Sequence, residues 1–477
     1  MPRKPHVAIV GRTNVGKSTL FNCLVGRRQA VVETVPGVTR DRLYETAEHD
    51  GREFVAIDTG GIAGGESDPL LAQVTEHAEI AIQEADALIF LVDGQEGLTS
   101  LDHDIADLVR KSGKPYFLAA NKLESPKLSG ESFLDLRLGQ PHEISALRDI
   151  GVDDLLDDLV AALPPAEPDE EGAEDDTIRI AVVGRPNVGK SALVNAIVGQ
   201  QRVIVSELPG TTRDAIDVAM RWQDRDFVLI DTAGLRRKAR VKQSLEYYCV
   251  VRALRAIDRA DVALLVTDAS EGVAEQDAKI GGYAHEAGTA SVIVANKWDL
   301  IRDSVRERAE ELEDEGRLRR TSVRRMNRVV RRDFETAARG VLSFMDYAPI
   351  VFTSALKGTG IDDALAAAYA AAQEHARRIS TGELNRLVLR AVSSHNPPSR
   401  KGRQLRIYYA TQVKARPPTI VLFVNDPGLM HWSYERYLIR FLRRNCGFVG
   451  TPLKLFVRAR ERQARSRRSG RRKKTRT

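Results

Sequence analysis

Two long stretches of this chain repeat one another. Gly11-Arg-Thr-Asn-Val-Gly-Lys-Ser18 recurs as Gly184-Arg-Pro-Asn-Val-Gly-Lys-Ser191, 173 residues later. Pro36-Gly-Val-Thr-Arg-Asp41 recurs as Pro209-Gly-Thr-Thr-Arg-Asp214 at the same offset of 173. Because a constant offset means equal loop lengths, the chain is predicted to hold two copies of one domain. Each copy is long enough to bury a core of its own.

Short apolar runs alternate with helical patterns in each copy, which is typical of a parallel sheet with crossover helices. The predicted fold class is α/β, with two tandem domains that each have a mostly parallel sheet and helices on both faces. The repeated motifs follow these runs, at the sheet edge where such folds bind ligands. The predicted strands are residues 7–10, 54–57, 87–92, 116–120, 180–183, 227–230, 262–266 and 292–295.

Charge divides the chain into an acidic front and a basic rear. The net charge is +6 overall, but residues 380–459 carry +11 and residues 460–477 carry +9, so the remainder carries −14. A basic rear predicts a polyanionic partner. The expected divisions are domain one at 1–163, an acidic linker at 164–177, domain two at 178–378, a small domain at 379–459 and a disordered basic tail at 460–477.

The small C-terminal domain is predicted to be α+β. Its pattern gives a helix to residue 392, strands at 405–412 and 419–425, a helix at 432–444 and a last strand ending at 457. The second helix carries Arg436, Arg440, Arg443 and Arg444 among Tyr434, Tyr437 and Phe441. Arginines beside aromatics suit RNA. The alternative is an ordinary basic helix with its aromatics in the core, which we favour for the aromatics.

An insertion interrupts the second copy. Asn121-Lys122 recurs as Asn296-Lys297 at an offset of 175, but Ser145-Ala146 recurs as Ser354-Ala355 at an offset of 209. The jump of 34 places extra residues at about 303–340. They hold an acidic stretch, 307–315, followed by Arg317, Arg319, Arg320, Arg324, Arg325, Arg328, Arg331 and Arg332. The insertion is either a second RNA contact or an arm paired with its own acidic stretch.

Cysteine usage and hydropathy predict a cytoplasmic protein. Cys23, Cys249 and Cys446 lie far apart without metal-type spacing, which favours a reducing compartment. No apolar run approaches the roughly 20 residues that a spanning helix needs. We therefore expect no membrane partner.

The repeated glycine-rich motif follows a predicted strand and opens a predicted helix. In that setting, backbone amides and the helix N-terminus wrap a phosphate. Lys17 and Lys190 are expected to reach the β- and γ-phosphates, and Ser18 and Ser191 to bind Mg²⁺.

Three further positions in each copy fit the same ligand. Thr39 and Thr212 lie in loops rich in proline and glycine that could close on the metal and open again. Asp58 and Asp231 end apolar strands and are expected to reach the metal through water. Gly61 and Gly234 would offer amides to the γ-phosphate. The expected metal set is Ser18, Thr39, Asp58, Ser191, Thr212 and Asp231.

A carboxylate after Asn-Lys predicts which base is bound. Asp299 can accept two hydrogens from the N1 and N2 edge of guanine, and adenine lacks that pair of donors. The first copy has Glu124 instead, which is one methylene longer. Weaker guanine binding at the first site is one expectation. Ser145-Ala146 and Ser354-Ala355 are expected to support the guanine carbonyl through backbone amides.

No glutamine stands after the metal-linked loop to orient an attacking water, because Ile62 and Leu235 occupy that place. Asn14 and Asn187 in the phosphate loops could help to hold a monovalent cation beside the phosphates. Alternatively, each asparagine only braces its loop.

With Thr411-Gln-Val, Pro417-Pro418, Phe423-Val-Asn-Asp-Pro427 and Ser433-Tyr-Glu-Arg-Tyr437 behind two such motif sets, the chain resembles the EngA (Der) family of double Era-like GTPases from His6 to Phe456. The resemblance implies hydrolysis of GTP to GDP and phosphate, a C-terminal KH-like domain, and K⁺-stimulated turnover. It also implies association with the large ribosomal subunit and its rRNA, and a role in its assembly. Neither DNA nor a membrane is expected as a partner, and a monomer is expected.

The expected site can now be stated in full. The catalytic set is Asn14, Lys17, Thr39, Gly61, Asn187, Lys190, Thr212 and Gly234. The GTP-binding set of the first copy is Gly11, Arg12, Thr13, Asn14, Val15, Gly16, Lys17, Ser18, Asp58, Thr59, Gly60, Gly61, Ile62, Asn121, Lys122, Leu123, Glu124, Ser145 and Ala146. That of the second is Gly184, Arg185, Pro186, Asn187, Val188, Gly189, Lys190, Ser191, Asp231, Thr232, Ala233, Gly234, Leu235, Asn296, Lys297, Trp298, Asp299, Ser354 and Ala355.

Two other functions compete with a GTP switch. A phosphotransferase or metabolic ATPase would share only the phosphate loop, and the guanine-reading motifs argue against it. An RNA-binding scaffold with a silent nucleotide site stays open for the first copy because of Glu124, whereas Asp299 argues against it for the second.

Overall fold

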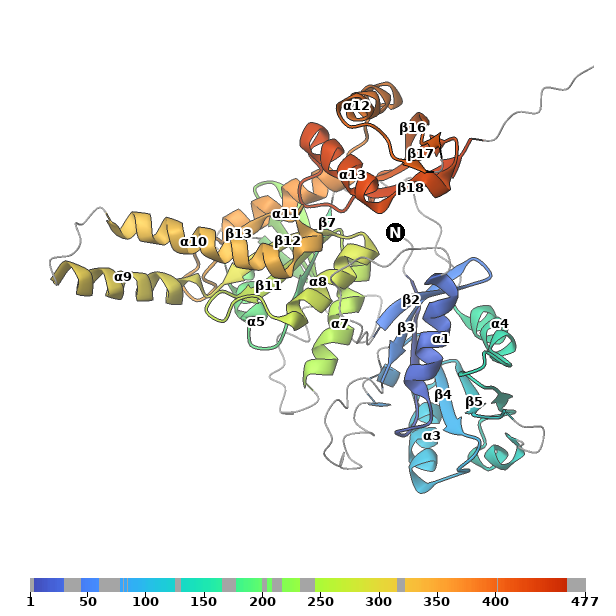
Figure 1. The fold of residues 1–477 in the computed structure, drawn as a ribbon. Coiled ribbons are helices and arrows are strands. Elements are labelled where there is room, and N and C mark those ends of the chain that lie inside the picture. Colours follow the sequence, from blue (N-terminus) through green and yellow to red (C-terminus); the bar gives the residue numbers. More distant parts are fainter. Residues whose placement is uncertain are drawn as a thin grey trace, which may run out of the picture.

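The computed structural model describes residues 4–29, 44–59, 78–79, 81–83, 85–124, 130–164, 177–199, 204–207, 217–231, 245–314, 322–400 and 402–460. These residues form two α/β domains and a small C-terminal α+β domain (Figure 1). Most of the predicted acidic linker and basic tail lies outside them. Within them, no helix has both the length and the apolar character to cross a membrane.

The first domain has a six-stranded sheet in the order β2-β3-β1-β4-β5-β6, parallel throughout except where β2 pairs with β3. Its elements are β1 His6–Val10, α1 Lys17–Gln29, β2 Tyr44–His49, β3 Arg52–Asp58, β4 Ala87–Asp93, α3 Ser100–Ser112, β5 Tyr116–Asn121, a 3₁₀ turn at Gly130–Leu136, β6 His142–Glu143 and α4 Val152–Ala162.

The second domain repeats this arrangement and adds one edge strand. Its order is β13-β12-β11-β7-β10-β9-β8, so that β9 to β13 occupy the places of β2 to β6 and β8 is extra. Its elements are β7 Ile178–Val183, α5 Lys190–Val198, β8 Ile204–Glu207, β9 Val218–Trp222, β10 Arg225–Ile230, α7 Leu245–Arg259, β11 Val262–Asp268, α8 Glu275–Ala287, β12 Ala290–Asn296, α9 Trp298–Asp314, α10 Ser322–Val341, a 3₁₀ turn at Ser343–Met345, β13 Ile350–Phe352 and α11 Ile361–Ala376.

Strand β1 shows why an unbroken apolar run forms a central strand. Its side chains alternate between two cores: Val7 and Ile9 pack in one, and Ala8 and Val10 in the other. Helices α1 and α4 cover the first face and α3 covers the second. Since successive strand residues point to opposite faces, both faces must be apolar when helices cover both.

All eight predicted strands are present, and the sequence analysis missed the sheet edges. Strand β2 has only one buried residue, Ala47, and reads YETAEH, so it lacks an apolar run. Strands β6 and β13 are two and three residues long, too short for a pattern to reveal.

The C-terminal domain packs two helices against a three-stranded sheet ordered β16-β17-β18. The predicted strand at 405–412 is wrong at its start, because Leu405 and Arg406 lie between β15 and β16, and the last strand ends at 459 rather than 457. The elements are α12 Thr381–Ser394, β14 Ser399–Arg400, β15 Arg403–Gln404, β16 Ile407–Lys414, β17 Thr419–Val424, a 3₁₀ turn at Pro427–Leu429, α13 Trp432–Cys446 and β18 Lys454–Ala459.

Helix α13 corrects one expectation about RNA binding. Arg443 turns inward and donates from Nη1 to the carbonyls of Phe448 and Thr451, at 2.7 and 2.8 Å. Arg443 therefore stabilises the fold of the C-terminal domain and is not available to bind RNA. The aromatics do belong to the core, as favoured: Tyr434 is 4% exposed, and the Tyr437 hydroxyl donates to the Ala391 carbonyl.

The C-terminal domain is joined to the second domain by buried polar contacts. The Ser291 amide donates to the Gly450 carbonyl at 2.6 Å, and the Gly450 amide donates to the Tyr347 carbonyl at 2.8 Å. A Cβ on Gly450 would lie 2.5 Å from the Cβ of Ala371, and its φ is +77°, so the close approach requires glycine. The Arg443 guanidinium lies 4.7 Å from the centre of the Tyr347 ring.

The first and second domains meet through a polar cluster. His6 Nε2 lies 2.7 Å from Asp258 Oδ2, and the Tyr283 hydroxyl donates to the same carboxylate at 2.8 Å. The Tyr44 hydroxyl donates to the Lys279 carbonyl at 2.7 Å, and its ring packs edge-on against Tyr283. The contact thus joins β1 and β2 of one domain to α7 and α8 of the other.

Candidate functional site

In each α/β domain, the glycine-rich loop lies at the end of the central strand and leads into a helix. A Cβ on Gly11 would lie 2.3 Å from the Leu91 carbonyl oxygen, and one on Gly16 would lie 2.4 Å from Asn121 Nδ2. Gly184 and Gly189 of the second copy are confined in the same way, at 2.3 Å each. Only glycine lets the loop approach the next strand and the asparagine so closely.

The lysine of the first loop is buried. Lys17 is 6% exposed, and its Nζ donates to the carbonyls of Gly11 and Arg12 at 2.9 and 2.6 Å. Burial lowers the pKa of Lys17 to about 8, although Asp58 opposes the shift. A bound anion beside Nζ would supply the charge that this buried ammonium needs. Lys190 Nζ makes the equivalent bond to the Arg185 carbonyl at 2.6 Å.

The loop backbones are arranged to receive an anion. Within the described part of the chain, the amides of residues 13–16 and 187–189 donate to no protein acceptor. Helices α1 and α5 begin directly after them, at Lys17 and Lys190. Free amides at a helix N-terminus form an anion site, and the exposed Ser18 and Ser191 hydroxyls lie in the same first turns.

Asn14 and Asn187 have the left-handed backbone conformation, with φ of 66° and 64°. Both side chains are exposed and make no hydrogen bond to any described residue. The described loops are therefore not braced by these amides, and both stay available to a ligand.

Each loop arginine is held by acidic side chains. Arg12 Nη1 donates to Glu96 at 2.5 Å, and its Nε lies 3.3 Å from Asp102 Oδ2 in the first turn of α3. Arg185 repeats this with Glu271 at 2.7 Å and Asp277 at 3.3 Å. A nucleotide would therefore meet the backbone of these arginines rather than their engaged guanidinium groups.

One asparagine side chain in each copy ties the phosphate loop to the predicted base-reading loop. Asn121 Nδ2 donates to the Val15 carbonyl at 2.8 Å, and its Oδ1 accepts from the Ala146 amide at 2.9 Å. Asn296 makes the same two bonds, to the Val188 carbonyl at 2.9 Å and from the Ala355 amide at 3.0 Å. Three motifs that are distant in sequence thus meet around one amide group.

The lysine after each asparagine is paired with an aspartate that the sequence analysis missed. Lys122 donates to Asp93, and Lys297 donates to Asp268. Burial alone would raise the pKa of Asp93, but hydrogen bonds from Lys122 and from two backbone amides hold it below its ordinary value. The signal was present, because Asp93 and Asp268 follow apolar strands at the same offset of 175 as the asparagines.

The two predicted base-reading carboxylates have different surroundings. Glu124 Oε2 lies 3.0 Å from Arg148 Nη2, and its Oε1 lies 3.4 Å from the Ser145 hydroxyl. In the second copy, Lys357 stands in the place of Arg148 and donates to Asp303 at 2.7 Å. Asp299, which is 8% exposed, makes no ion pair among the described residues. The first carboxylate is engaged, and the second is free to accept hydrogen bonds.

The strand-ending aspartates also differ. Asp58 is 2% exposed, and the neighbouring Thr59 hydroxyl donates to the Ile9 carbonyl at 2.7 Å. Asp231 has a φ of 55°, and its amide donates to Asp217 at 3.1 Å. The remaining predicted positions lie outside the described residues: Thr39, Gly60, Gly61, Ile62, Thr212, Thr232, Ala233, Gly234 and Leu235.

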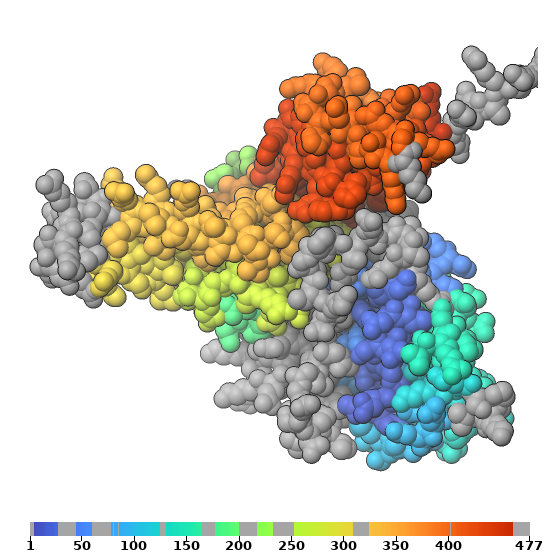
Figure 2. Space-filling view, viewed as in Figure 1, coloured from blue at the N-terminus to red at the C-terminus, as the bar shows by residue number. Residues whose placement is uncertain are grey.

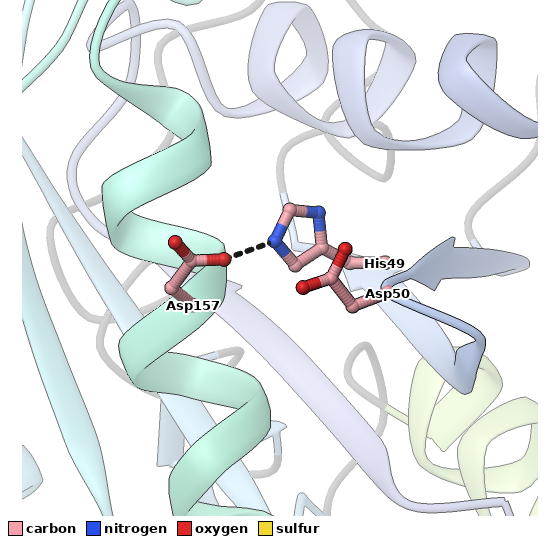
Figure 3. Close-up of side chains that lie close together, drawn as sticks. All are labelled: His49, Asp50 and Asp157. Carbon is pink, nitrogen blue, oxygen red and sulfur yellow. Dashed lines mark hydrogen bonds and ion pairs between the residues drawn. The ribbon is translucent and has the colours of Figure 1, made fainter.

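Away from these loops, one described cluster has the donor types of a metal site: His49, Asp50 and Asp157 (Figure 3). His49 Nε2 lies 2.5 Å from Asp157 Oδ1, and both aspartates are exposed. The pair links the C-terminal end of β2 to α4. This contact accounts for the cluster without a metal.

Two family models match three segments of the chain. A family model described as a 50S ribosome-binding GTPase matches residues 6–122 and again 179–297. A second model, described as the KH-domain-like C-terminal part of EngA bacterial GTPases, matches residues 378–458.

Curated relatives are similar over their full length. The protein named GTPase Der from Moorella thermoacetica is 51% identical over 463 residues, covering 96% of this chain and 100% of that protein. GTPase Der from Desulforamulus reducens is 50% identical over 459 residues, covering 96% and 99%. A solved structure of the Y63A variant of Era from Aquifex aeolicus, bound to GDP and tetrafluoroaluminate, is 26% identical, with a TM-score of 0.28, and the match covers 44% of this chain and 74% of that one.

Proposed function

The chain belongs to the GTPase Der (EngA) family, and on that basis we propose that it is a GTP-driven switch in assembly of the large ribosomal subunit. Three features that recur in both domains support a switch with two sites: the loop lysine, the confined glycines and the asparagine bridge. By asparagine bridge we mean the two hydrogen bonds through which Asn121 or Asn296 joins the phosphate loop to the predicted base-reading loop. Residues 1–163 and 178–378 would each act as one switch unit, in a protein that works as a cytoplasmic monomer.

We propose the following roles toward the nucleotide. Lys17 and Lys190 would bind the β- and γ-phosphates together with the free loop amides. Asp299, and with lower affinity Glu124, would accept hydrogens from guanine. The loops that carry Thr39, Gly61, Thr212 and Gly234 would close when the γ-phosphate is bound and open after hydrolysis.

Mg²⁺ fits the donors at the phosphate end. The Ser18 hydroxyl is exposed in the first turn of α1, and the Asp58 carboxylate is close enough to Lys17 for the two charges to interact. Hydroxyl and carboxylate oxygens are the ligands that Mg²⁺ prefers. Ser18, Thr39 and Asp58 would hold it in the first site, and Ser191, Thr212 and Asp231 in the second. When bound, it neutralises charge on the phosphates.

Hydrolysis would use K⁺ in place of an oriented side chain. Ile62 and Leu235 cannot orient water by hydrogen bonding, so another charge must act beside the phosphates. Asn14 and Asn187 are exposed and unbonded within the described loops, which leaves their carbonyl oxygens available for a monovalent cation.

The C-terminal domain would bind rRNA through α13. Arg436, Arg440 and Arg444 are exposed at helical spacing, on one face. Trp432, 50% exposed, lies under the Arg436 guanidinium at 5.6 Å. An exposed aromatic beside arginines can stack a base while the arginines bind phosphates.

The test combines ribosome binding with turnover. Full-length protein should co-sediment with purified large ribosomal subunits in a non-hydrolysable GTP analogue more than in GDP, and the triple variant R436Q/R440Q/R444Q should lose most of this binding. Turnover should be faster in potassium than in sodium salts. Equal binding in both nucleotides would exclude a nucleotide gate, and equal turnover in both salts would exclude the cation.

A second candidate function is a scaffold whose first site is weak, and the Glu124–Arg148 pair favours it. Because guanine must compete with Arg148 for the carboxylate, Arg148→Ala should tighten GTP binding at the first site. A partly exposed ion pair stabilises by up to about 1 kcal/mol, so the gain should be at most about fivefold in Kd. Titration with a fluorescent GTP analogue measures it.

The second domain supplies the matched control for this prediction. Lys357→Ala should leave GTP affinity unchanged, because Lys357 pairs with Asp303 rather than with Asp299. If Arg148→Ala weakens GTP binding instead, Arg148 contacts the nucleotide itself and the competition does not exist.

A further inference from the structure

Helices α9 and α10 form an arm that projects from the second domain (Figures 1 and 2). We define the arm as residues 298–341. At about 1.5 Å of rise per residue, the 20 residues of α10 span about 30 Å. The two helices pack against each other along the arm.

The base of the arm is fixed to the second domain. Trp298, Phe334 and Phe352 pack edge to face, with ring centres between 4.4 and 5.9 Å apart. Arg339 donates to the carbonyls of Met345 and Ala348 at 2.8 and 2.6 Å. Because Trp298 and Asp299 also belong to the predicted guanine-reading motif, the arm begins inside the second nucleotide site.

The outer half of α10 is a basic ridge. Residues 322–332 contain five arginines and no acidic residue, and all five side chains are exposed: Arg324, Arg325, Arg328, Arg331 and Arg332. Arg324, Arg328 and Arg332 follow one another at i, i+4 and i+8, so they share a face over about 12 Å.

Among the described residues, one of the five ridge arginines has a partner. Arg331 contacts Glu335 at 3.5 Å and the Phe352 ring at 4.2 Å. The other four ridge arginines make no ion pair or hydrogen bond with a described side chain, and Glu307 is the one acidic side chain of the stretch 307–315 that the structure describes. These four exposed charges are therefore accessible to a ligand on the described face of the arm.

We propose that this arginine ridge, residues 324–332 of the arm, binds RNA through its phosphates as a contact separate from the C-terminal domain. Arginine pairs with phosphate through two parallel hydrogen bonds. A protein partner would need an apolar or aromatic anchor, and the one apolar side chain of the ridge that is fully on the surface is Val329, 50% exposed, whereas Met326 and Val330 are half-buried. The ridge has no aromatic residue that could stack on bases. It therefore binds the RNA phosphate backbone and does not discriminate between RNA sequences. It does not depend on nucleotide gating of the ribosome.

The test compares two full-length triple variants for binding of a labelled RNA hairpin across a potassium chloride series. R324Q/R328Q/R332Q removes three ridge charges with a residue of similar helix propensity. K111Q/R137Q/R221Q removes the same charge from exposed positions elsewhere. The ridge variant should lower the slope of log Kd against log salt by about two to three, and weaken binding at low salt by at least about tenfold. The control variant should bind as wild type.

A circular dichroism spectrum and a GTP turnover rate equal to those of the wild type would show that the ridge variant is folded. An unchanged salt slope in a folded variant would overturn the proposal, and so would an equal loss in the control variant, since net charge alone would then explain the binding. Unchanged RNA binding with loss of binding to polyglutamate would assign the ridge to an acidic protein instead.

Discussion

Replacing Lys17 by alanine should abolish nucleotide binding at one of two sites, and Lys190→Ala should abolish it at the other. Each ammonium would make charged hydrogen bonds to phosphate oxygens, which contribute about 1.5–3 kcal/mol apiece. Loss of two such bonds weakens binding by at least about 100-fold. Equilibrium titration with a fluorescent GTP analogue should therefore fall from two sites per chain to one in each variant.

Lys111→Ala is the matched control, because this exposed lysine lies on α3 away from both loops. It should retain two sites. Two sites of unchanged affinity in both loop variants would mean that the phosphate end of the ligand lies elsewhere.

Acid should destabilise the junction between the second and C-terminal domains. Burial lowers the pKa of His285 to about 4 and that of His375 to about 3, with Arg443, Lys454 and Arg416 adding to the shifts. Both imidazoles titrate near 6.5 in the unfolded chain. Below pH 6.5 the unfolded state binds more protons than the folded state. The free energy of unfolding is therefore highest above about pH 6.5 and decreases as the pH falls. At pH 5 each histidine costs about 2 kcal/mol of unfolding free energy.

Calorimetry of the full chain at a series of pH values measures this effect. The wild type should lose about 4 kcal/mol more stability than H285Q/H375Q between pH 7.5 and pH 5. His103→Gln, which changes an exposed histidine on α3, should follow the wild type. Parallel profiles for the wild type and the double variant would show that these imidazoles do not titrate on unfolding.

Sequence predicted the parts of this molecule that depend on local pattern. The central strands appear as apolar runs because helices cover both of their faces, and the glycine-rich loops appear because close packing against a neighbouring carbonyl permits no side chain. Constant offsets then paired the motifs across the two copies.

The contacts that sequence did not reveal are those made between distant segments. In the sequence, nothing distinguishes Arg443 from the other arginines of α13. Only the fold shows that its guanidinium lies beside the Tyr347 ring. Arg148 lies 24 residues beyond Glu124, and nothing in the local pattern signals that the two side chains meet. Strand β2 forms because an edge strand needs a neighbour rather than an apolar run.

The asparagine bridge has a consequence for how duplicated domains diverge. Asn121 and Asn296 hold their loops by the same atoms in both copies, whereas the surroundings of Glu124 and Asp299 lie outside the bridge and differ. Mutation could therefore alter the base end of one copy while its phosphate end stayed assembled. After a gene duplication, two domains of this kind can evolve different affinities for GTP. A single chain then binds the same nucleotide at two different concentration ranges.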